Sequence, residues 1–295
     1  MSYGSPAAGP EQVPVCPRHP DRVSYVTCQR CGRPACPECQ RPAAVGFHCV
    51  DCVRELAAAD QGRKARTVYG GTARPGGRPV VTFALIGLCV LVYALQWLVP
   101  NDEVYQDFAY ANSAVLTAQE PWRMLTSAFL HSQGFFLHIL LNMYTLWLFG
   151  QALEPYLGRI RFLAVYLLSA VGGSVGYLLL APPPATAVIG ASGAIFGLFG
   201  GLFVVMRQRG GDVRQLLVLI VINAVLGFVI PGIAWQAHLG GLLTGAAATA
   251  VIAYAPRGRS RTAVQTGGLV AVAVVLAVAT LVRVSAVPVP AGLSL

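Results

Sequence analysis

Long apolar segments alternate with polar segments along most of the chain. Seven of the apolar segments extend for about 20 residues, the length that an α-helix needs to cross a bilayer. They cover residues 79–99, 134–151, 160–181, 187–206, 214–230, 234–255 and 266–286. Because a segment inside hydrocarbon must satisfy its own backbone hydrogen bonds, we expect each one to be helical. The pattern predicts an all-α polytopic membrane protein.

The composition supports this class and argues against another. The chain has 295 residues, of which 55% are hydrophobic and 11% are charged, whereas soluble globular proteins carry about 25% charged residues. A formal net charge of +9 would also suit a protein that binds nucleic acid. The arginines, however, gather beside the apolar segments, where they act as topology signals. We therefore expect no nucleic-acid partner.

The arginines also predict the orientation of the spans. In a chain that starts in the cytoplasm, the connections after the second, fourth and sixth spans are cytoplasmic. These connections hold Arg159, Arg161, Arg207, Arg209, Arg214, Arg257, Arg259 and Arg261. The long loop after the first span is acidic instead. By the positive-inside rule we expect a multi-pass protein of the cell membrane, with a cytoplasmic amino terminus and a carboxyl terminus outside.

The polar amino-terminal region holds seven of the eight cysteines and lacks the pattern of a signal peptide. Its ligand-type residues come in four pairs, Cys16 with His19, Cys28 with Cys31, Cys36 with Cys39, and Cys49 with Cys52. Pairs at this spacing grip tetrahedral metal ions, and cytoplasmic thiols favour metal over disulfides. Eight ligands predict two closed, structural zinc sites, with His48 as a substitute for Cys49.

The alternation of the pairs resembles B-box and related cross-brace zinc fingers. A cross-brace would join the first pair with the third and the second with the fourth, although the spacing alone leaves the pairing open. Two roles also stay open for this domain. It is either a fold that metal stabilises because its core is small, or a module that binds a cytosolic protein partner.

These patterns divide the chain into five parts. The expected parts are a disordered leader at 1–14, a zinc-finger domain at 15–53, a basic flexible linker at 54–78, a core of six spans at 79–255, and a loop with the seventh span and a short tail at 256–295.

Four polar side chains interrupt three of the spans. His138 and Asn142 lie early on the second span, Ser192 lies early on the fourth, and His238 lies early on the sixth. These spans run in the same direction, so we expect the four side chains several ångströms below the outer surface. Polar groups inside a membrane are costly and usually face the interior of the helix bundle. Four of them at one depth predict a site.

Glycines at a spacing of four residues accompany Ser192 and His238. They are Gly193, Gly197 and Gly201 on the fourth span, and Gly241 and Gly245 on the sixth. Small residues at this spacing let two helix backbones approach closely. This approach would bring the serine within reach of the histidine.

A serine beside a histidine indicates nucleophilic catalysis. The hydroxyl of Ser192 becomes a nucleophile when a base such as His238 takes its proton. The backbone amides of Ser192 and Gly193, with the side chains of His138 and Asn142, are candidates to stabilise the oxyanion. Since no acidic residue lies in the right spans to orient His238, we expect a dyad rather than a triad.

The motifs between about residues 120 and 250 resemble those of the rhomboid family of intramembrane serine proteases. The matching stretches are Trp122-Arg123, Thr126 to His131, His138-Ile139-Leu140-Leu141-Asn142, Gly150 to Arg161, Gly190-Ala191-Ser192-Gly193, and His238 to Gly245. The resemblance covers the six-span core and leaves out the zinc domain and the seventh span.

The resemblance implies a role for each residue of the site. Ser192 is the nucleophile, His238 is the general base, and His138 and Asn142 support the oxyanion. It also implies that the substrates are transmembrane segments of other proteins, cut near the outer face without a metal or cofactor in catalysis. Phe196 occupies the position where some members have a tyrosine that stacks on the base, and either ring can do so.

Two alternatives remain from other functional classes. The first is a catalytically silent rhomboid-like adaptor that binds membrane helices and recruits cytosolic partners through the zinc domain. Such relatives lack the serine or the histidine, whereas this chain has both. The second is a transporter. Two observations argue against it, because no acidic residue lies in any span and the sequence has no convincing internal repeat.

Overall fold

The computed structural model describes residues 13–62, 66–71, 78–182 and 186–287. The leader expected at residues 1–14 lies outside the described residues except for its last two positions. The chain separates into two compact units, Met1–Lys64 and Ala65–Leu295.

The first unit contains two short antiparallel hairpins and a helix. Its elements are β1 (Val15–Cys16), β2 (His19–Val23), the 3-10 turn η1 (Pro37–Cys39), β3 (Gln40–Pro42), β4 (Phe47–Cys49) and α1 (Val50–Gly62). Strand β1 pairs with β2, and β3 pairs with β4. The buried cluster of this unit consists of Ala35 and six cysteines. Because an apolar core of this size cannot offset the entropy of the chain, we expect bound metal to stabilise the unit.

The expectation of a flexible linker over residues 54–78 is wrong for its described residues before position 72. Helix α1 continues to Gly62 because residues 55–59 are a run of strong helix formers. Residues 66–71 form a closed turn in which the Tyr69 side chain is buried. This turn belongs to the second unit.

The second unit is a bundle of apolar helices. They are α2 (Val80–Leu98), α6 (Phe136–Leu157), α7 (Arg159–Leu180), α8 (Ser192–Gln208), α9 (Arg214–Val229), α10 (Trp235–Tyr254) and α11 (Arg261–Ser285). Within the described residues, five of these helices are long and apolar enough to cross a membrane, while α8 and α9 are shorter apolar helices. The predicted all-α membrane fold, with six core helices and a seventh, is confirmed.

The loop between α2 and α6 has a structure of its own. It contains η2 (Pro100–Asp102), α3 (Glu103–Phe108), α4 (Ala114–Gln119), α5 (Arg123–Thr126) and η3 (Ser127–Phe129). The buried Arg123 guanidinium pins this loop, because it pairs with Glu120 and donates to backbone carbonyls of α3 and its end.

The helix at the fourth predicted span begins at Ser192 and not at residue 187. Val188 forms an extended bridge with Tyr110, through backbone N···O distances of 2.7 and 3.3 Å. Gly190 has a φ of +120°, which turns the chain into the helix. Ser192 is therefore the first residue of α8, rather than a residue several positions inside a helix.

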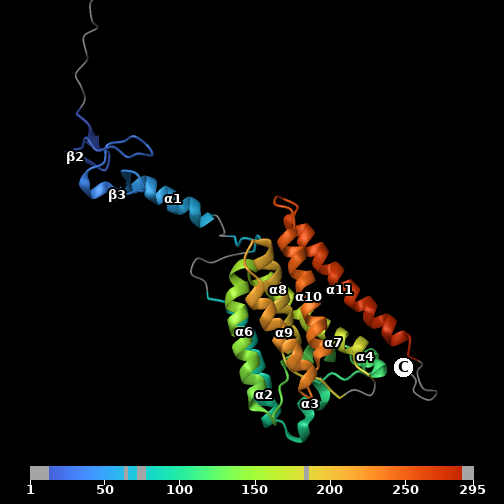
Figure 1. The fold of residues 1–295 in the computed structure, drawn as a ribbon. Helices are drawn as coiled ribbons and strands as arrows, with labels where there is room; N and C mark the ends of the chain where they lie inside the picture. The colour runs from blue at the N-terminus through green and yellow to red at the C-terminus, as the bar shows by residue number, and fades with distance from the viewer. Residues whose placement is uncertain (1–12, 63–65, 72–77, 183–185, 288–295) are drawn as a thin grey trace, which may run out of the picture. The chain divides into compact units, whose positions relative to one another are not determined.

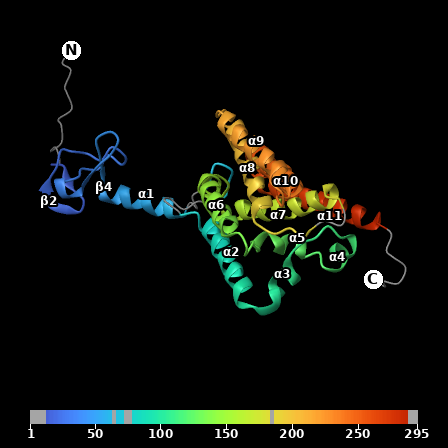
Figure 2. The ribbon, with the colours of Figure 1, turned by 60° about the horizontal axis from the view of Figure 1, so that its bottom comes forward.

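Helices α7, α8 and α10 meet at the centre of the bundle, and Figures 1 and 2 show α8 and α10 side by side. Glycines make this contact close. A Cβ atom at Gly241 would collide with the carbonyl of Gly193, and one at Gly245 would collide with the backbone of Gly197. The two rows of glycines therefore face each other. Any side chain larger than hydrogen at these positions would force the backbones of α8 and α10 apart.

Glu154 links two helices at the end of the bundle remote from Ser192. It lies near the end of α6 and caps the start of α2. Its carboxylate, 4% exposed, accepts from the amides of Val81 and Thr82 at 3.0 and 2.9 Å, and from the Thr82 hydroxyl at 2.8 Å. A negative charge at the amino-terminal end of α2 is favourable to the helix dipole.

Candidate active site and metal centres

Ser192 and His238 form the central contact of the candidate active site. The distance between Ser192 Oγ and His238 Nε2 is 2.9 Å, although the residues are 46 positions apart. Ser192 begins α8, and His238 lies in the first turn of α10. The glycine contacts between these helices permit this approach. At this distance the hydroxyl can donate its proton to the imidazole nitrogen.

An aromatic ring stacks on the His238 imidazole and holds the plane of that ring in place. Phe196, one turn after Ser192, stacks on it with ring centroids 4.1 Å apart and an interplanar angle of 8°. Nδ1 of His238 is buried and has no hydrogen-bond partner among the described residues. The ring is thus oriented by stacking and by the serine, and no described carboxylate contacts it as a third member.

His138 lies beside the serine with a defined tautomer. Its Nδ1 accepts a hydrogen bond from the Ser132 amide at 3.1 Å, so in the neutral ring the proton is on Nε2. This Nε2 faces Gly190, where an added Cβ would lie 2.7 Å from it and 3.9 Å from Ser192 Oγ. His138 therefore presents a donor next to the nucleophile.

Asn142 is buried near His138 but uses its amide differently from our expectation. Its Nδ2 donates to the His138 carbonyl at 2.7 Å, one turn earlier in α6. In this conformation that donor satisfies the helix backbone and is not directed at Ser192. A role at the oxyanion requires another rotamer or the second hydrogen of the amide.

Gln96 and His131 support His138 from outside the predicted site. Gln96 Oε1 accepts from the His131 amide, and Gln96 Nε2 donates to the His131 carbonyl, both at 3.0 Å. The His131 ring lies 5.3 Å from the His138 ring, centroid to centroid. Gln96 was not among the predicted site residues, although a polar side chain in an otherwise apolar span is the signal that would have found it.

His131 is buried, and its surroundings keep it neutral. Burial lowers the pKa of His131 to about 4, and the nearby His138 adds to the effect. A neutral ring at physiological pH fits a structural role for this buried residue.

The first unit brings the predicted metal ligands into two groups of four. One group is Cys16, His19, Cys36 and Cys39, and the other is Cys28, Cys31, Cys49 and Cys52. Within each group the ligand atoms lie within 4.8 Å of one another. These groups join the first pair with the third and the second with the fourth, which is the cross-braced arrangement. His48 belongs to neither of these groups.

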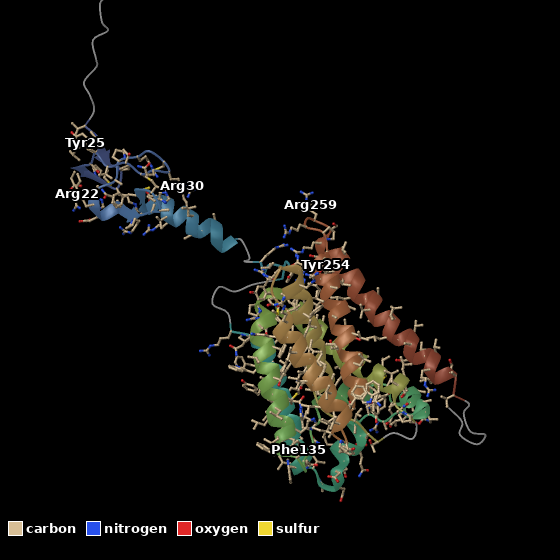
Figure 3. All side chains as sticks on the ribbon, in the orientation of Figure 1. Arg22, Tyr25, Arg30, Phe135, Tyr254 and Arg259 are labelled. Carbon is tan, nitrogen blue, oxygen red and sulfur yellow. The ribbon has the colours of Figure 1, made fainter. Side chains whose placement is uncertain are left out.

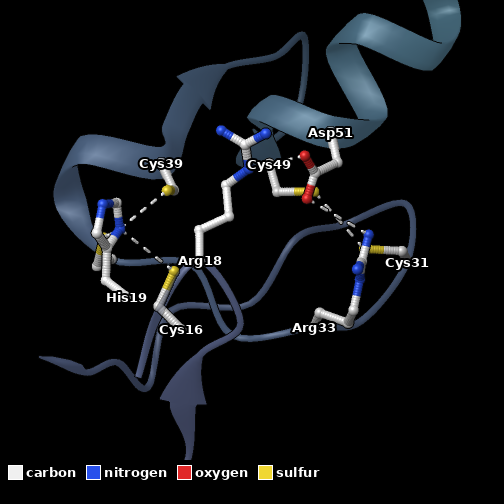
Figure 4. A network of polar contacts seen from close by, with 9 residues as sticks. Cys16, Arg18, His19, Cys31, Arg33, Cys39, Cys49 and Asp51 are labelled. Atoms are coloured by element: carbon white, nitrogen blue, oxygen red, sulfur yellow. Dashed lines mark hydrogen bonds and ion pairs between the residues drawn. The ribbon is translucent and has the colours of Figure 1, made fainter. Parts of the chain in front are cut away.

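The geometry of each group fits a tetrahedral metal ion. In the first group, His19 Nδ1 faces three thiols, at 3.2 Å from Cys36 Sγ, 3.4 Å from Cys39 Sγ and 3.9 Å from Cys16 Sγ. The other ring nitrogen faces Glu38 at 3.9 Å, as expected for a histidine ligand oriented by a carboxylate. Figure 4 shows this convergence of sulfur atoms on the ring.

In the second group, polar contacts favour the thiolate form that binds metal. The Arg33 guanidinium donates to Cys31 Sγ at 3.4 Å and lowers the pKa of the Cys31 thiol. The Cys49 amide donates to Cys28 Sγ at 3.1 Å. Asp51 joins the two halves of the unit, at 2.9 Å from Arg18 and 3.9 Å from Arg33 (Figure 4).

Comparison with known proteins gives one consistent answer. The family model described as Rhomboid domain matches residues 118–255. Rhomboid protease GluP of Bacillus subtilis is 33% identical over 184 residues, which are 60% of this chain and 35% of that protein. Putative rhomboid protease YdcA of the same organism is 36% identical over 172 residues, covering 57% of this chain and 85% of that protein. Rhomboid protease GlpG of Haemophilus influenzae is 27% identical over 173 residues, with 56% and 86% covered.

Proposed function

The chain belongs to the rhomboid family of intramembrane serine proteases, and we propose that Ser192 and His238 form the catalytic dyad with which it cleaves transmembrane segments of other proteins. The observation that carries the proposal is the 2.9 Å contact between Ser192 Oγ and His238 Nε2 within a membrane-helix bundle. The match covers only about a third of GluP, so the substrates of that protein are not transferred to this one.

The first chemical step is an attack by the serine. Ser192 Oγ adds to the carbonyl carbon of the scissile peptide while His238 Nε2 takes the hydroxyl proton. The tetrahedral intermediate collapses when His238 gives this proton to the leaving amine, which breaks the C–N bond. A water molecule then attacks the acyl-serine, with His238 again accepting and returning a proton, and Ser192 is released.

Several donors of this chain can stabilise the oxyanion. The amides of Ser192 and Gly193 lie in the first turn of α8, where backbone N–H groups lack intrahelical acceptors and the helix dipole is positive. The Nε2–H of His138 lies beside Gly190 and close to Ser192 Oγ. Asn142 would contribute through another rotamer or through the second hydrogen of its amide. The loss of one such donor typically costs about 10²–10³ in kcat.

The arginine distribution supports an orientation for the protein. We propose a cell-membrane protein with a cytoplasmic amino terminus and an outside carboxyl terminus, because the arginine-rich connections then face the cytoplasm. Ser192 begins α8 at the opposite end from these connections. Substrates are then cut near the outer face of the membrane, at residues that destabilise a helix.

For the first unit we propose two structural zinc ions and a role as a cytosolic interaction module. Seven thiols would be deprotonated on binding, and three sulfurs with one nitrogen, or four sulfurs, are ligand sets that zinc prefers. Both groups are closed, with no position for a reactive water. The catalytic chemistry uses none of these residues.

A cleavage assay tests the proposed activity. Protein reconstituted in liposomes is incubated with a panel of transmembrane segments that carry helix-destabilising residues. We expect wild-type protein to cut at least one segment within its membrane portion, and Ser192→Ala and His238→Ala to cut none. A folded wild type that cuts no segment would favour the silent adaptor, which binds the same helices without cleaving them.

A further inference from the structure

A turn formed by residues 66–71, here the anchored turn, is fastened to the bundle at the end opposite Ser192. Tyr69 is 1% exposed, and its hydroxyl donates to the side chain of Gln208, the last residue of α8, at 2.9 Å. The turn is closed internally, since the Thr67 amide donates to the Gly71 carbonyl at 2.8 Å. Its position is therefore fixed by contacts with the bundle.

Gln265 connects the anchored turn to three helices. This side chain of α11 is 2% exposed, and its Nε2 donates to the carbonyls of Tyr69 and Ile252, at 3.0 and 2.9 Å. Its Oε1 accepts from Arg161 Nε of α7 at 2.7 Å. One buried amide thus holds the turn and the adjacent ends of α7, α10 and α11 together.

Three arginines gather around this junction and form what we call the arginine triad. Arg66 begins the anchored turn, Arg161 lies in the first turn of α7, and Arg261 is the first residue of α11. A Cβ at Gly70 would lie 3.5 Å from the Arg261 side chain, so this arginine packs against the turn. Arg66 belongs to the same turn, which Gln265 connects to Arg161 by donating to the Tyr69 carbonyl and accepting from Arg161 Nε.

The positive charge of the triad has no described counter-charge. Within the described ranges, no carboxylate lies within ion-pair distance of any of the three guanidinium groups. Nε of Arg261 is buried there without a hydrogen-bond acceptor. Two of the arginines also occupy helix amino-terminal turns, where the dipole disfavours cations. The positive-inside rule accounts for arginines at this end, but not for a buried donor that lacks an acceptor.

We propose that the arginine triad binds a phosphate group, supplied by an anionic phospholipid headgroup or by free phosphate. Phosphate accepts several charge-assisted hydrogen bonds from planar guanidinium groups, and its charge suits three arginines beside two helix amino termini. The bound anion holds Arg66 beside Arg161 and Arg261, and so fastens the anchored turn to the bundle. The site is separate from the proposed dyad and does not depend on it.

The test measures binding of two phosphate sources to the purified full-length protein in neutral detergent. The probes are inorganic phosphate and dioleoylphosphatidylglycerol in mixed micelles, with dioleoylphosphatidylcholine as a zwitterionic comparison. We expect one saturable site, and a loss of about tenfold or more in affinity for Arg261→Gln, since a charge-assisted hydrogen bond contributes about 1.5–3 kcal/mol. Arg259→Gln is the matched control, because Arg259 is an exposed arginine of the preceding loop (Figure 3).

Two results support the proposal and identify the source of the phosphate. Binding of inorganic phosphate points to a free anion, and binding of the phosphatidylglycerol alone points to a headgroup. If Arg261→Gln does not fold, Arg66→Gln gives the same test at an exposed side chain. Absence of saturable binding by either probe, or equal losses in Arg259→Gln and the triad variants, would overturn the proposal.

Discussion

At the residue scale, the orientation of His238 depends on very few contacts. Its Nε2 meets Ser192 Oγ at 2.9 Å and its ring stacks on Phe196, while Nδ1 has no partner among the described residues. In soluble serine hydrolases an acidic residue commonly performs this orienting task. Here the stacked ring of Phe196 orients the imidazole instead. Phe196 should therefore matter for activity more than an ordinary core phenylalanine.

Substitution of Phe196 tests this dependence. We expect Phe196→Leu to lower kcat/KM by up to about tenfold, because an aromatic stacking contact contributes about 0.5–1.5 kcal/mol. Phe196→Tyr should retain activity, since it keeps the ring. Phe149→Leu, which removes a buried ring of α6 that packs on Phe199, is the control and should leave kcat/KM unchanged in the folded fraction. Equal activity of Phe196→Leu and wild type would contradict the orienting role.

Gln96 is a second residue whose importance only the structure shows. Its amide makes two hydrogen bonds to the backbone of the buried His131, so Gln96→Leu leaves two buried polar groups without partners. We expect this change to lower the free energy of unfolding by about 2–3 kcal/mol, measured as a lower denaturation midpoint. Gln151→Leu, at an exposed position of α6, should change the midpoint little. Equal denaturation midpoints for the two variants would contradict a stabilising role of the Gln96 hydrogen bonds.

At the scale of elements, the contact between α8 and α10 decides whether the dyad can form. Their glycines face each other so closely that a methyl group at Gly245 would collide with the backbone of Gly197. Helices inside a membrane associate through such close packing, because burial of apolar surface gives little driving force there. The two rows of glycines therefore position the catalytic residues as well as stabilise the bundle.

A pair of alanine substitutions separates packing from helix propensity. Gly245→Ala should lower both the melting temperature and the rate of substrate cleavage. Overpacking should lower the free energy of unfolding by about 1–3 kcal/mol. Gly267→Ala on α11 is the control, since a Cβ there meets nothing within 4 Å, and it should be neutral or stabilising. A melting temperature for Gly245→Ala at or above that of Gly267→Ala would refute the close contact.

Elements were predictable from the sequence to different degrees. Each of the seven apolar segments contains a helix, because uninterrupted hydrophobicity over about 20 residues leaves few alternatives. The start of α8 at Ser192 was not predictable, because it depends on a backbone bridge between Val188 and Tyr110, far apart in the sequence. The four ligand pairs of the first unit could be predicted from their spacing in the sequence. Which two pairs share a metal site could be determined only from the fold.

At the scale of the whole molecule, two compact units use different means of stabilisation. The bundle is held by helix packing and by buried polar contacts such as those of Glu154 and Gln265. The first unit has a buried cluster made almost entirely of cysteines. The order of residues 66–71 was not predictable, because a basic, glycine-rich stretch reads as a linker until Tyr69 is seen inside the bundle.

Metal removal should therefore affect one unit and spare the other. We expect two metal ions per chain by elemental analysis, and a strong chelator should make the seven cysteines of the first unit reactive to a thiol reagent. Cys89 is the internal control, since it is fully buried in the bundle and should stay unreactive. Seven accessible thiols before chelation, or a metal content near zero in folded protein, would contradict the metal assignment.

Labelling by a fluorophosphonate probe, which reacts with activated serines, tests most directly whether His238 activates Ser192. We predict that detergent-purified wild type is labelled at Ser192, that Ser192→Ala and His238→Ala lose labelling, and that Ser285→Ala keeps it, because Ser285 lies exposed at the end of α11. Absence of labelling in folded wild type, or equal labelling of His238→Ala and wild type, would contradict a serine activated by His238.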